Sequence, residues 1–438
     1  MAAVVAKFGG TSLADAKQFK KVKDIIMSDP DRKYVVPSAP GKRFSDDTKV
    51  TDLLYSLYAK RNDGKTEFED VYKKIFTRFC ELRDDLDLSI KIEDHIEKIK
   101  NDILDGESED YAASRGEYLS GVILAEYLGY EFVDPKDYIF FDENGVFQEE
   151  ETKTVFRGKL KNVKNAVIPG FYGSTPSGSI KTFSRGGSDI TGAIVARTVR
   201  ARLYENWTDV SGFMMADPRI VKDPKIIKTI TYRELRELAY MGATVIHEDC
   251  IFPVFTAGIS INVKNTNAPE EEGTMIIPDM SKSKEADIIT GIAGKKNFTV
   301  IAIEKNKMNY ELGFGRRILR VIEKNEINFE HMPTGIDTLS LVVETDKING
   351  KKQKIIDDIF KECEPDSIEI FDNLALIATV GRGMIRNVGI AAKLFAALSD
   401  ANINVRMIDQ GSSELNIIVG VENDDFAKAV NAIYKAFV

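Results

Sequence analysis

The sequence has little that would support a secreted, membrane-embedded or nucleic-acid-binding protein. Its 438 residues include three cysteines, Cys80, Cys250 and Cys363, which are far apart and lack metal-ligand spacing. This usage favours reduced thiols. No N-terminal signal-peptide pattern is present, and no apolar run reaches the ~18 residues of a membrane span. The formal net charge is −9, whereas nucleic-acid and anionic-membrane binders are usually basic. We therefore expect a cytoplasmic protein that binds neither nucleic acid nor membranes.

Two common nucleotide-binding signatures are also missing. No Gly-x-x-x-x-Gly-Lys-[Ser/Thr] segment occurs, which excludes a standard P-loop, and no Gly-x-Gly-x-x-Gly segment follows the first predicted strand. A dinucleotide site is therefore unsupported. The acidic run at 270–272 is typical of a solvated loop, so we predict no protein-bound metal.

Two glycine-rich turns are the most informative segments that are present. They are Lys7-Phe8-Gly9-Gly10-Thr11-Ser12 and Ser184-Arg185-Gly186-Gly187-Ser188-Asp189. Glycine lets the backbone approach a ligand closely, and unpaired N–H groups at a helix start favour negative charge. Lys7 adds a point charge, and Arg185 adds a planar fork suited to a carboxylate or a phosphate. One Gly-Gly pair usually marks only a tight turn, but two turns of this composition predict a phosphate-transfer site.

The first part of the chain alternates strands and helices. Apolar segments at 4–8, 34–36 and 203–207 predict strands, and helical spacing follows Gly10 and covers 190–199. This rhythm predicts an α/β fold with an open, mostly parallel sheet, helices on both faces, and ligands at its carboxyl edge. Loop-like composition near 268–285 predicts a boundary. We therefore place a catalytic domain at residues 1–282.

The C-terminal part contains an internal repeat with an offset of 76 residues. For example, Val300-Ile301-Ala302 matches Leu376-Ile377-Ala378, and Gly313 matches Gly389. Each copy reads as a ferredoxin-like βαββαβ module. The second copy ends after its last helix, so its fourth strand must come from elsewhere, and residues 287–293 are the nearest candidate. We expect a regulatory domain at 283–438 with two interleaved modules, covering 297–372, and 286–294 plus 373–438.

At this point the motifs resemble those of the aspartate kinase family, in the amino acid kinase superfamily. The two glycine turns, Trp207-Thr208-Asp209-Val210 with Asp217-Pro218-Arg219, and the segment 237–243 carry the resemblance. The paired C-terminal modules resemble ACT domains. The resemblance implies a monofunctional enzyme with the amino acid kinase fold. Such an enzyme transfers the γ-phosphoryl group of ATP, with Mg²⁺ carried mainly by the nucleotide, to the side-chain carboxylate of L-aspartate. The product is 4-phospho-L-aspartate, in the first step of lysine, threonine and methionine biosynthesis.

The resemblance also implies roles for individual residues. Lys7 and Asp189 are expected to be catalytic, Arg185 to clamp the substrate α-carboxylate, and Glu117 to receive its ammonium group. The acceptor carboxylate is already ionised at neutral pH, so the task is electrostatic rather than general-base catalysis. The expected substrate contacts are Ser38, Thr48, Glu117, Arg185 and Ser188, and the expected nucleotide contacts are Lys7, Phe8, Gly9, Gly10, Thr208, Asp209, Met214, Asp217 and Arg219. Met214 and Asn267 stand where other members often have tyrosine and lysine, which leaves the adenine side open.

Control by an amino-acid effector is the last expectation. L-lysine, with L-threonine as a second candidate, is expected to bind between ACT modules of two subunits, in a homodimer or a dimer of dimers. The expected effector contacts are Met308, Phe314, Glu330, Thr334 and Asp337. The sequence leaves open which amino acid inhibits, whether inhibition is concerted, and whether dimers pair.

Two alternative functions remain. One is another amino acid kinase, acting on glutamate or N-acetylglutamate. Glu117 argues against it because N-acetylation removes the ammonium group, and the ACT pair argues against it because those relatives lack paired ACT modules. The other is a non-catalytic amino-acid sensor, which the presence of Lys7, Arg185 and Asp189 disfavours.

Overall fold

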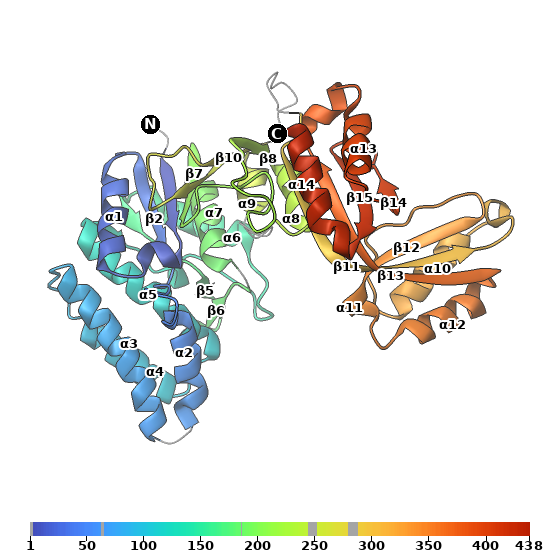
Figure 1. Cartoon of the computed structure of the whole chain (residues 1–438). Coiled ribbons are helices and arrows are strands. Elements are labelled where there is room, and N and C mark those ends of the chain that lie inside the picture. The colour runs from blue at the N-terminus through green and yellow to red at the C-terminus, as the bar shows by residue number, and fades with distance from the viewer. Residues whose placement is uncertain (1–2, 63–64, 185, 244–251, 279–287) are drawn as a thin grey trace. The chain divides into compact units, whose positions relative to one another are not determined.

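The computed structural model describes all residues except 1–2, 63–64, 185, 244–251 and 279–287 (Figure 1). Contacts divide the chain into two compact units. Unit 1 comprises Met1–Phe213, Ile226–Tyr232 and Thr244–Ser281, and unit 2 comprises Met214–Lys225, Arg233–Ala243 and Lys282–Val438. The main division thus lies near residue 282, but two segments from the expected catalytic range pack in unit 2.

Hydrogen bonds explain why these two segments pack there. The Ile292 amide donates to the Met215 carbonyl at 2.7 Å. Glu234 lies on α8 (Tyr232–Tyr240) and accepts from the Thr290 hydroxyl at 2.6 Å and from the Arg382 amide at 2.9 Å. Thr290 and Arg382 are 56 and 148 residues away from Glu234 along the chain, so local composition does not reveal these contacts.

Unit 1 is built on an eight-stranded sheet in the order β3-β4-β2-β1-β7-β9-β10-β8. Every neighbouring pair is parallel except β9 with β10, which confirms the predicted open, mostly parallel sheet. The strands are β1 (Val4–Phe8), β2 (Arg32–Pro37), β3 (Glu131–Phe132), β4 (Ala166–Val167), β7 (Leu203–Thr208), β8 (Thr229–Thr231), β9 (Ile261–Asn265) and β10 (Thr274–Ile277). A separate hairpin pairs β5 (Tyr172–Ser174) with β6 (Ile180–Thr182).

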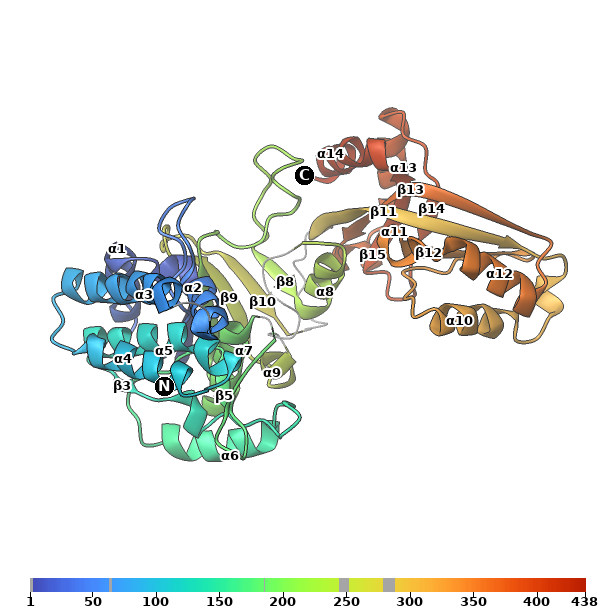
Figure 2. The same cartoon turned by 90° about the horizontal axis from the view of Figure 1, so that it is seen from below.

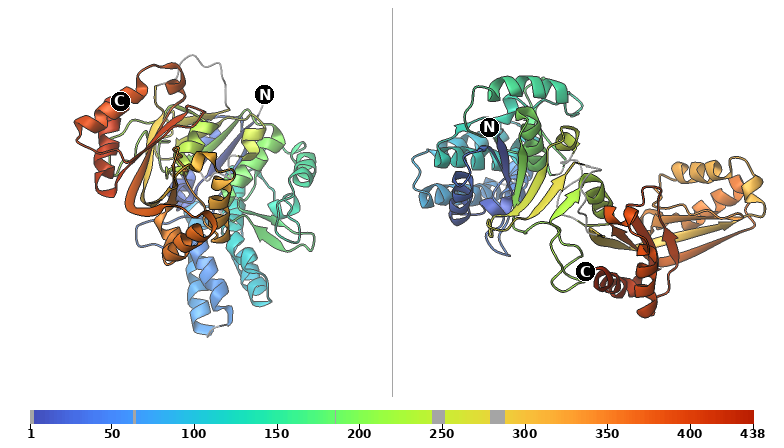
Figure 3. Two further views of the ribbon diagram at one scale, coloured as in Figure 1. Left: turned by 90° about the vertical axis from the view of Figure 1, so that its right-hand side faces the viewer. Right: turned by 90° about the horizontal axis from the view of Figure 1, so that it is seen from above.

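Helices cover both faces of this sheet (Figures 2 and 3). One face carries α1 (Ala16–Met27) and α5 (Glu109–Leu128), with α2 (Val50–Ala59), α3 (Lys65–Asp85) and α4 (Ile92–Leu104) packed outside them. The other face carries α6 (Glu149–Leu160), α7 (Gly187–Val199) and α9 (Phe252–Thr256). Strand alternation divides the side chains between the two faces: Ala6 and Phe8 lie in the core under α1 and α5, so Lys7 faces α7.

The strand order places a ligand crevice at a definite point. From β1 the chain runs outward through β2 and β4 on one side, and it returns to β7 and β9 on the other. The order therefore reverses between β1 and β7. In open α/β sheets, ligands bind beyond the carboxyl ends of the strands at such a reversal, and the first glycine turn follows β1 there.

Unit 2 contains a five-stranded antiparallel sheet in the order β12-β11-β13-β15-β14. Its two long strands, β11 (Gly291–Glu304) and β13 (Ser367–Val380), pair along their lengths. Residues 291–295 of β11 pair with 376–380 of the second repeat, while 298–304 pair with β12 of the first. The strand expected at 287–293 thus begins at Gly291, and residues 286 and 287 lie outside the described part of the chain.

Helices complete both repeats on this sheet. Gly313 and Gly389 precede α10 (Phe314–Lys324) and α13 (Ile390–Asp400) with φ of 79° and 90°, a left-handed conformation that suits glycine. The remaining elements are α11 (Thr345–Ile348), α12 (Lys352–Cys363), α14 (Phe426–Phe437), β12 (Thr338–Glu344), β14 (Met407–Asp409) and β15 (Asn416–Glu422). Among the described helices, none is both long and apolar enough to cross a bilayer.

Candidate active site

Lys7 lies at the centre of a buried polar cluster at the end of β1. Its Nζ is 2.6 Å from Asp189 Oδ1 on α7, and it donates to Asn206 Oδ1 on β7 at 3.4 Å. Asn206 Nδ2 in turn donates to Asp189 Oδ1 at 2.9 Å. Lys7 is only 7% exposed, so its charge needs this carboxylate. The structure brings together the two residues predicted to be catalytic.

Sequence reasoning missed Asn206. It pairs directly with Lys7 in the β1–β7 register, and it is buried. A polar side chain inside the apolar segment 203–207 was a usable signal, but its partner becomes evident only from the strand order.

The first glycine turn is fixed from two sides. The Gly9 amide donates to the Trp207 carbonyl at 2.9 Å, and the Gly41 amide donates to the Gly10 carbonyl at 2.7 Å. A Cβ on Gly10 would lie 2.8 Å from the Ala39 carbonyl oxygen, so only glycine fits this close approach. The turn opens a short 3-10 helix, Gly10–Leu13, and α1 begins only at Ala16.

Phe8, another predicted nucleotide contact, turns its side chain away from the glycine turn. It is fully buried, and its ring stacks on Trp207 with centroids 5.9 Å apart. The alternation of β1 sends Phe8 into the core and Lys7 to the opposite face, so only the Phe8 backbone remains near the turn.

Glu117 is a buried carboxylate with spare bonding capacity. It is 6% exposed, and its Oε2 atom has no hydrogen-bond partner among the described residues. Burial raises the pKa of Glu117 to about 7, opposed by a hydrogen bond from the Ala39 backbone and by the charges of Arg115 and Lys7. A Cβ on Gly116 would lie 2.7 Å from the Ala39 side chain, which shows how closely α5 approaches the loop after β2. An unpaired buried acceptor of this kind suits a cationic ligand.

The second glycine turn begins α7. Gly186 has φ of 60° and precedes the helix, Ser188 is buried in its first turn, and Asp189 faces Lys7. A Cβ on Gly170 would lie 2.5 Å from the Ser188 side chain, so the β4 loop closes over this helix start. Arg185, the predicted substrate clamp, lies outside the described residues.

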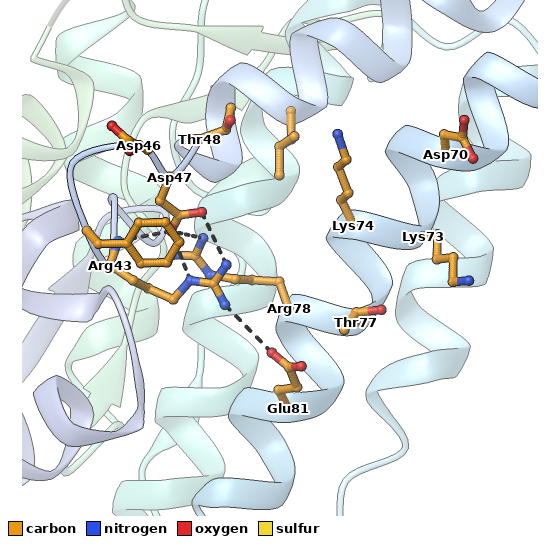
Figure 4. A pocket seen from close by; sticks show the side chains of 12 residues that line it. Arg43, Asp46, Asp47, Thr48, Asp70, Lys73, Lys74, Thr77, Arg78 and Glu81 are labelled. Carbon is orange, nitrogen blue, oxygen red and sulfur yellow. Dashed lines mark hydrogen bonds and ion pairs between the residues drawn. The ribbon is translucent and has the colours of Figure 1, made fainter.

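The loop after β2 carries the other two predicted substrate contacts. The amide of half-buried Ser38 donates to the Phe8 carbonyl at 3.0 Å, which holds this residue beside the glycine turn. Thr48 is exposed at the far end of the loop, where it lines a pocket of about 630 Å³ together with Asp47 and Arg78 (Figure 4). Ser38 therefore lies beside the glycine turn, and the contact of Thr48 with the substrate stays a prediction.

The predicted nucleotide residues fall into two groups. Thr208 and Asp209 follow β7, and the Thr208 hydroxyl donates to Asp209 at 3.1 Å. Met214, Asp217 and Arg219 belong to unit 2, where Asp217 and Arg219 form an ion pair of 2.6 Å that lowers the pKa of Asp217. Their place beside the glycine turn stays a prediction.

Asn267, which stands where other members often have lysine, lies close to a lysine from another element. Lys21 of α1 donates to Asn267 Oδ1 at 2.7 Å. The hydroxyls of Ser12 and Thr266 also lie 2.8 Å apart, which ties the first glycine turn to the end of β9.

The predicted effector contacts lie in unit 2, and their roles stay predictions. The amides of Met308 and Phe314 donate to the carbonyls of Lys305 and Glu311, at 3.1 and 3.3 Å. Asp337 accepts from the Lys307 amide at 2.8 Å and thereby stabilises its own turn. Glu330 is half-buried and bonds Tyr240, while Thr334 is exposed.

No group of three or more His, Cys, Asp or Glu side chains is placed to hold a metal ion in the described part of the chain.

Comparisons with known proteins agree with the architecture. Residues 2–265 match the amino acid kinase family, and residues 377–437 match an ACT domain. Aspartokinase 3 of Bacillus subtilis is 38% identical over 453 aligned residues, which cover 99% of this chain and 98% of that protein. The crystal structure of Clostridium acetobutylicum aspartate kinase, described as an allosteric enzyme, is 57% identical over all of both chains, with a TM-score of 0.91. Escherichia coli aspartokinase III, solved with aspartate and ADP, shares the fold, with 24% identity over 99% of both chains and a TM-score of 0.74.

Proposed function

Because the chain belongs to the amino acid kinase family, we propose that the cluster around Lys7 is the active site of an aspartokinase. The enzyme transfers the γ-phosphoryl group of ATP to the side-chain carboxylate of L-aspartate. The Clostridium and Bacillus relatives, which match along essentially the whole chain, support this assignment.

One observation in the structure carries the choice of an amino-acid substrate. Glu117 presents an unpaired, buried carboxylate oxygen at the sheet edge where Lys7 lies, close enough for the Lys7 charge to affect its pKa. An amino acid has an ammonium group that can donate a hydrogen bond to the Glu117 carboxylate, and a carboxylate that the Lys7 ammonium group attracts. N-Acetylglutamate lacks the ammonium group, so it would leave the Glu117 carboxylate without a partner.

The residues of the site act by charge and position. Lys7 offsets the repulsion between the acceptor carboxylate and the transferred phosphoryl group, while Asp189 and Asn206 hold its ammonium group in place. The acceptor is already ionised, so no residue needs to remove a proton. The bond from the acceptor oxygen to phosphorus forms as the bond to the leaving oxygen breaks, and ADP is released.

Further contacts extend the same proposal. Arg185 would clamp the α-carboxylate, with Ser38, Thr48 and Ser188 beside it. The glycine turn would hold phosphate oxygens through the backbone amides of Gly9 and Gly10. Thr208, Asp209, Met214, Asp217 and Arg219 complete the proposed nucleotide site. Mg²⁺ would be carried by the nucleotide phosphates and would neutralise their charge.

A substrate comparison tests the function. ADP release is measured with L-aspartate, L-glutamate and N-acetyl-L-glutamate, and hydroxylamine traps the acyl phosphate product. We expect aspartate-dependent ADP release and a matching amount of hydroxamate. Preference for N-acetylglutamate would identify a different amino acid kinase, and aspartate binding without ADP release would identify a sensor.

The ACT modules are proposed to regulate the enzyme. L-lysine, with L-threonine as a second candidate, would bind between modules of two subunits and inhibit. The effector would contact the segment that carries Met308, Phe314, Glu330, Thr334 and Asp337, with Glu330 or Asp337 receiving a cationic side chain. Leu312 and Val388 are 95% and 103% exposed at equivalent positions of the two repeats, which supports association through these modules. Titration of activity with lysine and threonine, alone and together, tests the proposal.

A cytoplasmic location is also proposed, in agreement with the free thiols of Cys80 and Cys363.

A further inference from the structure

We propose that Arg78, on α3 and outside every motif, is a positioning residue that holds the loop after β2 in its aspartate-binding conformation. This loop comprises residues 38–48 and is called the substrate loop. This inference rests on the proposed function, because it concerns the binding of the same substrate.

Arg78 makes three bonds to separate parts of unit 1. Its Nη1 lies 2.8 Å from Asp47 Oδ2, and its Nη2 donates to the carbonyls of Gly41 at 2.5 Å and of Ala14 at 3.1 Å. The arginine is 6% exposed. A planar guanidinium can make these bonds at once, whereas a lysine ammonium is a single point charge. Arg78 therefore fixes two points of the substrate loop, Gly41 and Asp47, against Ala14, which lies just before α1.

Gly41 connects Arg78 to the reaction site. The Gly41 carbonyl accepts from Arg78, and the Gly41 amide donates to Gly10 in the glycine turn at 2.7 Å. A Cβ on Gly41 would lie 2.7 Å from the Gly10 carbonyl carbon, so the two backbones touch. Between Ser38 and Gly41, Ala39 also contacts Glu117. Displacement of the substrate loop would thus disturb Ser38 and Glu117 together.

Asp47 joins two arginines of different exposure (Figure 4). Arg43 binds it from within the loop, with Nε 2.9 Å from Oδ2, and Arg78 binds it from α3. The Arg43 side chain is 34% exposed and the Arg78 side chain 5%. The two guanidinium groups hold the pKa of Asp47 well below its ordinary value. Arg43 also pairs with Glu81 at 3.6 Å, but it makes no bond to Gly41 or Ala14 among the described contacts. It is therefore a matched control for loss of an arginine at Asp47 without loss of the bonds to Gly41 and Ala14.

The phosphate side of the site has anchors that do not involve Arg78. Gly9 bonds Trp207 of β7, and Ser12 bonds Thr266 after β9. Loss of Arg78 should therefore affect aspartate more than ATP. A purely structural arginine would give no such difference between the two substrates.

The test compares R78K, R78Q and R43Q with the wild type in the ADP-release assay. We expect R78K and R78Q to raise KM for aspartate about tenfold or more, with KM for ATP changed less than about threefold. R43Q should change KM for aspartate less than about threefold. Thermal unfolding is followed in parallel, and if R78Q does not fold, R78K decides.

Three results would overturn the proposal: unchanged KM for aspartate in R78K, equal increases for aspartate and ATP, or an effect of R43Q as large as that of R78K. Wild-type protein that releases no ADP with aspartate would instead contradict the proposed function. The two failures are therefore distinguishable.

Discussion

Lys7 is more deeply buried than a cleft lysine, and this changes how its removal should be tested. Lys7→Ala leaves Asp189 without its cation, at 2.6 Å in the native structure, and an unpaired buried charge destabilises a protein. We expect kcat to fall by about 10³-fold or more, because nothing else neutralises the two reacting anions. Thermal unfolding of Lys7→Ala and of Lys7→Ala with Asp189→Asn separates the loss of stability from the loss of chemistry. Near-normal turnover in either variant would contradict the mechanism.

Glu117 gives the site a pH dependence. Burial raises its pKa to about 7, and only the ionised form attracts an ammonium group. We expect KM for aspartate to rise as the pH falls through about 7, and Glu117→Gln to have a high KM that is insensitive to pH over the same range. Steady-state kinetics between pH 6 and 9 measure both. A wild-type pH profile retained in Glu117→Gln would assign the titration to another group.

The same group affects stability in the opposite direction. Its pKa is raised on folding, so the folded protein binds a proton more tightly than the unfolded chain, and stability is lost as pH rises through about 7. In the absence of aspartate, Glu117→Gln should therefore be more stable than the wild type at pH 8, by up to about 3 kcal/mol, and the difference should shrink towards pH 5. Denaturant unfolding at both pH values tests the sign.

At the scale of elements, contact between two loops defines the site. A Cβ on Gly41 would meet three backbone atoms of Gly10 and Thr11 within 3 Å, so Gly41→Ala must separate the substrate loop from the glycine turn. We expect activity to fall about tenfold or more and stability to fall by about 1–3 kcal/mol. Gly158→Ala is the control, because this glycine lies inside α6 with nothing within 4 Å of an added Cβ. It should keep full activity and gain about 0.5–1 kcal/mol.

The helices and strands themselves follow from local patterns. In α4 the buried residues Ile92, Ile96, Ile99 and Ile103 recur at helical spacing. In β1 the alternation that buries Phe8 also presents Lys7 to α7. The sequence therefore predicts these elements well, and it predicts the first glycine turn because glycine is required where the backbone meets Ala39.

At the scale of the whole molecule, the exposed apolar side chains predict association. Leu312 and Val388 stand immediately before the glycines that begin α10 and α13, and both are almost fully exposed in the single chain. We expect the wild type to sediment as a dimer or larger, and Leu312→Ser with Val388→Ser to shift the distribution towards monomer. Analytical ultracentrifugation at several concentrations measures this. A monomeric wild type would contradict association through these surfaces.

The sequence by itself determined the alternating α/β rhythm, the repeat of 76 residues and the two glycine turns. Each of these features depends on residues a few positions apart or on a periodic pattern. Such patterns can be recognised from the sequence alone. The resemblance to a known family added the chemistry.

Only the tertiary structure decided which distant residues meet. Asn206 joins Lys7 because β7 lies beside β1, and Arg78 reaches Gly41 because α3 packs beneath the substrate loop. The same packing buries the Phe8 side chain in the core and pairs the amides of Met308 and Phe314 inside their own turns. Strand order, side-chain burial and backbone hydrogen bonding all depend on contacts between segments remote in the chain, so no local pattern specifies them.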